Sequence, residues 1–273
     1  MAKPDRSNED EPVVESSIRD DVPAVETGTR ADGPAGSGHL PRDRASTLAL
    51  VFGVAAVTSL IGFEAGGYFP GTTSIAAIGF AVALILRVGL ARHPLEGFTR
   101  RFGVAFGSLA LFALWTLISA QWSDAPGRAV LEANRVLVYL GALALFGSLV
   151  RRRGRLAAFA GGLALGSIVV STAGLLTRVL PAVFPIAPET FGARLSYPLT
   201  YWNAAGLLAA VGILVSLGLS AAERLPRSWR AAIAGAIPVL AATLVLTFSR
   251  GAIAAGLVGL VILCAVCPTR TLL

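Results

Sequence analysis

Long apolar runs, separated by short polar connections, dominate the chain from about residue 47 to residue 267. A membrane-spanning helix needs about 20 predominantly apolar residues, with a range of about 17–25. The length of the runs excludes an ordinary soluble core and makes the lipid bilayer the expected surrounding. We therefore expect an all-α fold, a polytopic transmembrane helical bundle with about eight spans. The expected spans are residues 47–63, 72–90, 102–120, 134–150, 156–176, 203–220, 231–247 and 252–267.

Residues 1–45 differ from the rest of the chain in composition. They hold ten of the sixteen acidic residues and are rich in Pro, Gly and Ser, with no apolar period. Such a segment cannot bury enough surface to offset the entropy lost on ordering, and a signal peptide would place its apolar stretch near the N-terminus. We expect a disordered acidic cytoplasmic tail at 1–45, either solvated or docking a partner, and one transmembrane domain at 46–273.

The net charge of +7 and the pI near 10.4 do not indicate a nucleic-acid-binding protein. The arginines stand in short clusters between apolar runs, where they orient membrane helices. Past the tail, twelve arginines fall on the side that the positive-inside rule makes cytoplasmic, and five fall on the other. Both termini are therefore expected in the cytoplasm. The five outer arginines are Arg128, Arg135, Arg178, Arg194 and Arg250.

Two outer connections, about 121–133 and 177–202, are long enough to build a site. A helix over 123–139 is expected, capped by Ser123 or Asp124, with Pro126 in its first turn. Its polar residues fall on one face and form either a salt-bridged surface stripe or the wall of an outer cavity. The candidate wall residues are Arg128, Glu132 and Arg135 on this helix, with Glu189 from the second connection.

Arg250 is the only charge between residues 231 and 267. One helix of that length would span about 55 Å, too long for a membrane, whereas a hairpin gives two helices of about 25 Å. The turn Ser249–Gly251 then lies at the outer boundary. A charge there is costly unless it faces protein, water or an anion, so Arg250 either reaches the headgroups or faces a cavity, and we favour the cavity.

Small residues within the runs are expected to mediate helix packing, since they let helices approach closely in lipid. Two motifs of this kind are Gly103-x-x-x-Gly107 and Gly162-x-x-x-Gly166. A C-x-x-C pair, Cys264 and Cys267, stands at the cytoplasmic end of an apolar run, where small apolar core residues are far commoner than a metal or redox pair. No metal site is expected.

Three segments carry a resemblance to one family. Leu117-Ile-Ser-Ala-Gln-Trp-Ser-Asp-Ala-Pro126 is similar to the S-x-x-W-S-x-x-P passage of bacterial O-antigen ligase and polymerase-like proteins. Arg194-Leu-Ser-Tyr-Pro-Leu-Thr-Tyr-Trp-Asn203 resembles the segment that opens that family's core domain, and Leu246-Thr-Phe-Ser-Arg-Gly-Ala252 resembles its S-R-G motif. The three follow in the family's order over roughly residues 115–260.

The resemblance implies a glycosyltransferase of cell-surface polysaccharide biosynthesis in the bacterial inner membrane. Its donor is a glycan on undecaprenyl diphosphate, transferred or polymerised at the outer face onto a glycan or lipid acceptor, without a metal or other cofactor. By motif, Arg194 and Arg250 correspond to arginines that grip the donor diphosphate. The family continues into an outer loop with a functional histidine, so this sequence, which ends at Leu273, is expected to lack the C-terminal part.

Two other classes of protein stay open on the sequence. A transporter or channel for an anionic or lipid-linked substrate would also have an outer cavity lined by arginines. It would predict charges in mid-membrane and broken helices in two related halves; Pro238 is a candidate break without a counterpart. A structural or assembly protein of the cell envelope is the third possibility.

Overall fold

A computed structural model describes residues 42–90, 99–150, 153–184 and 194–266, all within one compact unit, Leu40–Leu273. Within these ranges the chain forms eight α-helices and two short 3₁₀ helices, with no strand, so the predicted all-α class is confirmed. The tail at 1–41 lies outside the described residues. The elements are α1 (Arg42–Phe63), η1 (Ala65–Gly67), α2 (Pro70–Leu90), α3 (Arg100–Ile118), η2 (Ser119–Gln121), α4 (Pro126–Leu149), α5 (Arg153–Val179), α6 (Trp202–Ser220), α7 (Arg227–Leu246) and α8 (Arg250–Val266).

Each expected span coincides with a helix, and the differences lie at the ends. Helix α1 begins at Arg42, several residues earlier than expected, and α4 begins at Pro126. The expected cap of α4 is wrong: its N-cap residue is Ala125, with no side-chain cap bond. The hydroxyl of Ser123 accepts a hydrogen bond from the Ala125 N–H at 3.1 Å. It therefore stabilises the turn before the helix instead of the helix itself.

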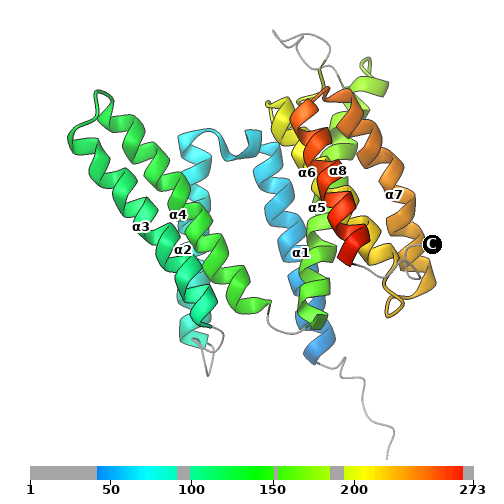
Figure 1. Cartoon of the computed structure of the whole chain (residues 1–273), viewed down its shortest axis with the longest axis horizontal. Helices are drawn as coiled ribbons and strands as arrows, with labels where there is room; N and C mark the ends of the chain where they lie inside the picture. Colours follow the sequence, from blue (N-terminus) through cyan, green and yellow to red (C-terminus); the bar gives the residue numbers. More distant parts are fainter. Residues whose placement is uncertain (1–41, 91–98, 151–152, 185–193, 267–273) are drawn as a thin grey trace, which may run out of the picture. The chain divides into compact units, whose positions relative to one another are not determined.

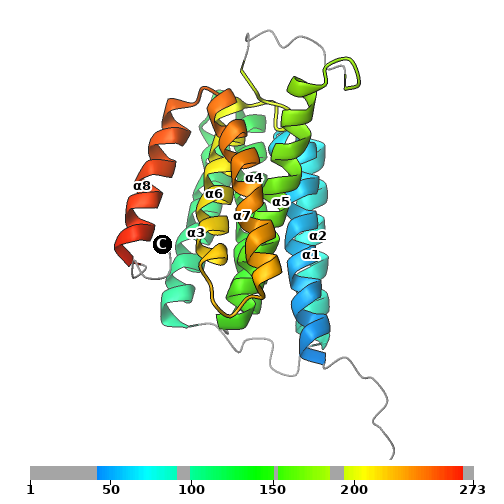
Figure 2. The same cartoon turned by 90° about the vertical axis from the view of Figure 1, so that its right-hand side faces the viewer.

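Helix α6 lies at the centre of one group of helices and packs against α5, α7 and α8, while α5 also packs along α1. Small buried residues line α6, including Ala205, Ala209 and Gly212, and such residues allow helix backbones to approach closely. A second group consists of α4 with α2 and α3 on it. Figures 1 and 2 show the helices running side by side, with η1 and the start of α6 at the same end. We call this the η1 end.

The two glycine motifs have different surroundings. A Cβ on Gly162 would lie 2.5 Å from the backbone oxygen of Val51, and one on Gly166 would lie 2.6 Å from Thr58 Cβ. The predicted packing role of this pair is therefore confirmed, at the contact of α5 with α1. Around Gly103 and Gly107 on α3, no heavy atom of the described chain lies within 4 Å of the added Cβ. This second motif does not pack within the described part of the chain.

The predicted hairpin at the end of the chain is present, although its helices separate. At 1.5 Å per residue, the 20 residues of α7 span about 30 Å and the 17 residues of α8 about 25 Å. The turn covers Thr247–Ser249, and Arg250 is the first residue of α8. From there α8 packs on α6 and touches α7 little. Pro238 lies inside α7, which runs unbroken from Arg227 to Leu246, so the break that a transporter would need is not found there.

Candidate functional site

Two of the three motif segments meet at the η1 end. The N–H of Leu195 donates a hydrogen bond to the backbone oxygen of Leu246 at 2.9 Å, which holds the irregular segment before α6 against the last turn of α7. We call residues 194–203 and 246–252 together the junction. The third motif segment, 117–126, covers the end of α3, η2 and the start of α4, at the same end of the helices (Figure 1).

A chain of side-chain hydrogen bonds holds the junction together. The hydroxyl of Ser249 donates to Asn203 Oδ1 at 2.7 Å and accepts from the N–H of Ala252 at 3.2 Å. Asn203 in turn donates from Nδ2 to the hydroxyl of Tyr201 at 2.7 Å. Ser249 is 2% exposed. It therefore caps α8 and fixes the start of α8 against the start of α6.

Two glycines make room for this arrangement. A Cβ on Gly206 would lie 2.8 Å from Thr247 Oγ1 and 2.9 Å from Ala252 Cβ, so α6 can approach the α7–α8 turn only without a side chain there. A Cβ on Gly174 of α5 would lie 2.5 Å from the backbone oxygen of Tyr197. Helices α5 and α6 thus both present glycine to the junction.

Strained backbone also gathers at this end of the helices. Among the described residues, the non-glycine positions with positive φ are Ala65 (55°), Thr200 (62°) and Phe248 (49°). They lie in η1, in the entry to α6 and in the α7–α8 turn. Such conformations cost of order 1–3 kcal/mol each and cluster at functional sites. The three therefore point to this end as the place of a site.

Arg194 and Arg250 are both exposed at the junction. The Arg194 guanidinium lies 5.0 Å from the ring centroid of Trp202, within cation–π range. Arg250 occupies the first turn of α8, where the helix dipole is positive and no acidic residue offsets it. Within the described ranges, neither arginine forms an ion pair with a carboxylate. An anion bound at this end of α8 would relieve the positive charge.

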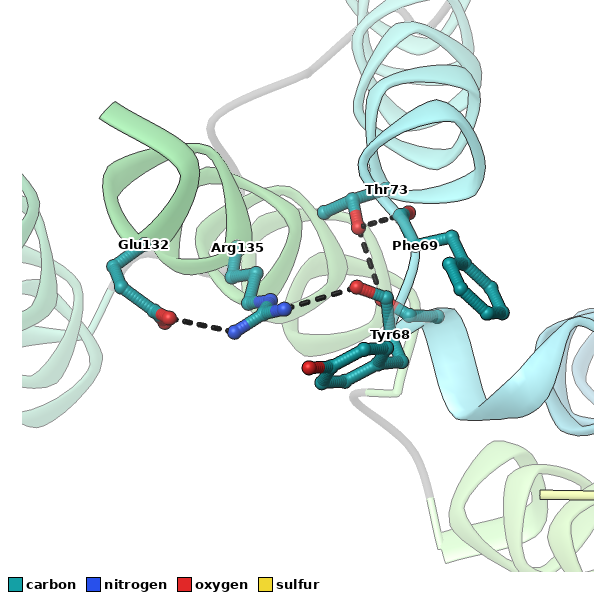
Figure 3. Close-up of polar contacts among 6 residues, drawn as sticks. Tyr68, Phe69, Thr73, Glu132 and Arg135 are labelled. Carbon is teal, nitrogen blue, oxygen red and sulfur yellow. Dashed lines mark hydrogen bonds and ion pairs between the residues drawn. The ribbon is translucent and has the colours of Figure 1, made fainter. Parts of the chain in front are cut away.

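A second polar cluster surrounds Arg135 on α4 (Figure 3). One guanidinium nitrogen lies 2.6 Å from Glu132 Oε1 in an ion pair, and the other donates to the backbone oxygen of Tyr68 at 2.9 Å. The guanidinium also lies 5.2 Å from the centroid of the Tyr68 ring. Nearby, the hydroxyl of Thr73 donates to the oxygen of Phe69 at 3.0 Å. Arg135 thereby ties α4 to the connection between α1 and α2.

The residues predicted to form a cavity wall have different surroundings in the structure. Arg135 lines a cavity of about 180 Å³ enclosed by α1, η1, α2 and α4. Glu132 is its ion-pair partner and does not itself line that cavity. Arg128 is exposed and likewise not part of the lining. Glu189 lies outside the described residues, so its role stays a prediction.

The connection η1 touches both clusters. Tyr68, which binds Arg135, follows it directly, and a Cβ on Gly66 of η1 would lie 3.7 Å from Leu199 Cδ2 in the junction. Leu199 is buried with Val170 of α5 and Ala205 of α6. The connection η1 therefore lies between the two clusters and is adjacent to each of them.

Sequence reasoning named the arginines and missed the residues that position them. Ser249 stands directly before a helix, a position that serine favours as a cap, so a signal for it existed. No local pattern links Asn203 to Ser249, or Tyr68 to Arg135, because the partners are far apart in the chain. Within the described residues, no group of three or more His, Cys, Asp or Glu could hold a metal ion. Cys264 is exposed on α8, and Cys267 lies outside the described ranges.

The fold defines the class of protein as multi-pass and α-helical, embedded in a membrane. Seven described helices are long and apolar enough to cross a bilayer, and α8 is a shorter apolar helix. Large apolar side chains are exposed along them, for example Ile75 at 72% and Leu111 at 68%, as lipid contact requires. Comparisons with protein-family models, curated proteins and solved structures give no match for this chain.

Proposed function

We propose that the protein is an O-antigen ligase-like glycosyltransferase, which transfers or polymerises a glycan from an undecaprenyl-diphosphate donor. The proposal places the reaction at the outer face of the bacterial inner membrane and the protein in cell-surface polysaccharide biosynthesis. The resemblance of the three motif segments supports it. So does the position of those segments at one end of the helices.

The observation that carries the proposal is the junction itself. Its two segments are separated by more than forty residues, yet the bonds Leu195–Leu246 and Ser249–Asn203 hold them together. Each segment contributes one exposed arginine, Arg194 or Arg250, without a carboxylate partner in the described part of the chain. Two arginines without a carboxylate partner among the described residues, one of them at a helix N-terminus, suit an anionic group such as a diphosphate.

The chemistry of transfer fits these residues. Attack of an acceptor hydroxyl on the sugar carbon breaks the bond from that carbon to the diphosphate oxygen, and negative charge builds on the leaving diphosphate. Fixed cations stabilise that charge in the transition state. Guanidinium groups remain charged and bind phosphate oxygens in pairs. Arg194 and Arg250 are proposed to bind the leaving group, whereas the base that takes the acceptor proton is not assigned.

The proposal predicts a loss of glycan transfer in arginine variants. Replacing Arg194 or Arg250 by Ala should lower transfer by about 10²-fold or more, the size seen when one transition-state donor is removed. Arg→Lys should also impair it strongly, because lysine is a point charge without the planar fork. The measurement is transfer of lipid-linked glycan in membranes that contain equal amounts of each variant.

Arg128→Lys is the matched control, since Arg128 is exposed at the same end and is not part of the described cavity lining. It should retain transfer close to the unmodified level. Unchanged transfer in all four variants of Arg194 and Arg250 would overturn the assignment of the donor site.

A further inference from the structure

An apolar groove lies between α1 and α2, where the two groups of helices meet. The described contacts join α1 to α5 and α2 to α4, whereas α1 and α2 touch each other little. A cavity of about 500 Å³ occupies the groove, and its lining residues are apolar except for Glu64 and Thr72. Two of the apolar lining residues, Leu60 and Ile75, are 67% and 72% exposed. The groove therefore opens toward the lipid around the helices.

The length of the groove matches one leaflet of a membrane. On α2 its lining runs over eleven residues, from Thr72 to Ala83, which is about 16 Å at 1.5 Å per residue. Half of the hydrocarbon core is about 15 Å. Apolar side chains beside an unfilled space lose dispersion contacts, and an acyl chain from the surrounding leaflet would restore them. The lining and the length together fit one lipid acyl chain.

A carboxylate stands at the mouth of the groove, at the η1 end. Glu64 directly follows the last residue of α1, and its side chain is exposed. Its Oε2 accepts a hydrogen bond from the hydroxyl of Thr72 at 3.3 Å. This bond links the end of α1 to the first turns of α2 and holds the carboxylate beside the apolar lining. A carboxylate accepts several hydrogen bonds at once, so this contact leaves it able to accept more.

The mouth of the groove is negative for a second reason. The C-terminal end of a helix carries a partial negative charge, and no basic residue lies in the last turn of α1. Arg135, which lines the neighbouring cavity of about 180 Å³, forms its ion pair with Glu132. Residues 185–193, in the connection from α5 to α6, include no basic residue. A headgroup with a positive group at this mouth would be favoured over an anionic one.

We propose that this groove binds a membrane phospholipid whose headgroup bears a primary ammonium group. One acyl chain lies between α1 and α2, and the ammonium group donates to the carboxylate of Glu64. A primary ammonium has three N–H donors and forms charge-assisted hydrogen bonds with a carboxylate. A quaternary ammonium has no such donor, and a glycerol headgroup leaves the phospholipid with a net negative charge. This lipid site is separate from the junction and does not depend on the proposed glycosyl transfer.

Native mass spectrometry of the purified full chain tests the headgroup part of the proposal. The protein is titrated with phosphatidylethanolamine, phosphatidylcholine and phosphatidylglycerol that carry the same acyl chains. Phosphatidylethanolamine should bind about fivefold more tightly than either of the others, the size expected for an exposed ion pair. Glu64→Gln keeps an oxygen for Thr72 and removes the charge, so it should lose this preference. Asp124→Asn, at an exposed acidic residue of the same end that is not part of the lining, should keep it.

A second variant tests the acyl-chain part without touching the carboxylate. Gly79 lines the cavity, and no heavy atom lies within 4 Å of an added Cβ, so Gly79→Leu adds side-chain volume there without a clash. It should weaken binding of all three lipids. Gly71→Leu, equally open on the same helix and not part of the lining, should not. Equal binding of the three lipids by the unmodified protein would overturn the proposal. So would an unchanged preference in Glu64→Gln, or unchanged lipid binding in Gly79→Leu.

Discussion

Ser249 shows how one residue can organise a site to which it supplies no charge. Its hydroxyl caps α8 at the N–H of Ala252 and also binds Asn203 of α6. Arg250 follows it directly, so the direction of the Arg250 side chain depends on this cap. The residue before it, Phe248, has a positive φ of 49°, a strain that the bonds of the neighbouring residues must offset.

Replacing Ser249 by Ala should therefore lower the stability of the protein. Loss of a helix cap costs about 0.5–2 kcal/mol, and the partly buried oxygen of Asn203 would lose its hydrogen bond from Ser249, which adds about 0.5–1.5 kcal/mol. We expect a lower unfolding temperature for Ser249→Ala in detergent. Ser123→Ala is the control, because that hydroxyl accepts one bond in an exposed turn, and its unfolding temperature should hardly change. Equal effects of the two substitutions would show that the Ser249 bonds contribute little.

At the scale of single residues, sequence alone could identify the charges and little of their surroundings. Arg250 stands out because it is the only charge between residues 231 and 267, and Arg194 stands out through the motif segment that it begins. Their neighbours could not be predicted, because Asn203 and Tyr68 become partners of Ser249 and Arg135 only when distant helices meet. The Arg135–Glu132 pair is three residues apart on one helix, and this local pair was visible in the sequence.

At the scale of the helices, the two glycine motifs show why the existence of a helix is easier to predict than its packing. Their sequences are alike, yet Gly162 and Gly166 contact α1, whereas Gly103 and Gly107 have no described neighbour. In water, an apolar stripe would mark the packed face. In lipid, the packed face and the lipid-facing face of a helix are both apolar. Small residues therefore indicate that a close helix contact is possible, but not which glycine motif makes one.

The different surroundings of Gly162 and Gly103 predict opposite outcomes when each of these glycines is replaced by Leu. Gly162→Leu would force a side chain against the Val51 backbone oxygen, 2.5 Å from its Cβ. Overpacking of this kind costs about 1–3 kcal/mol or more, since a backbone must move. Gly103→Leu enters open space and replaces glycine by a better helix former. Thermal unfolding followed by size-exclusion chromatography should show a loss of folded protein at lower temperature for Gly162→Leu alone. A matching loss for Gly103→Leu would mean that α3 has a packing partner outside the described contacts.

For the whole molecule, the number and approximate position of the described helices could be predicted from the sequence, because the bilayer sets a minimum length for an apolar helix. The arrangement could not. Adjacent helices are often neighbours, yet α8 leaves α7 to pack on α6, and α1 packs along α5 more than along α2. These choices depend on small residues such as Gly206 and Gly162 meeting particular partners. The sequence does not show which distant residues these glycines contact, so the helix arrangement could not be predicted from it.

The orientation of the bundle is the last prediction, and the proposed function depends on it. Twelve arginines past the tail fall on one side and five on the other, which predicts a cytoplasmic N-terminus and an outer η1 end. Reporter fusions after Asp124 and Glu189 should therefore report the outside, and fusions near Arg153 and Arg227 the cytoplasm. Because fusions truncate the chain, single cysteines in the full chain give an independent measurement, with Cys264 and Cys267 replaced by Ala.

Ser123→Cys and Ser228→Cys are a matched pair for this purpose. Both positions are exposed, the first before α4 at the η1 end and the second in the first turn of α7 at the other end. In intact cells a membrane-impermeant maleimide should label Cys at 123, and it should label Cys at 228 only after the membrane is opened. A lipid-linked donor on the outer leaflet can reach Arg194 and Arg250 only in this orientation. Labelling at 228 alone would therefore invert the topology and remove the outer-face glycosyl transfer with it. The geometry of the junction would be unchanged by this result, and an anion bound there would then come from the cytoplasmic side.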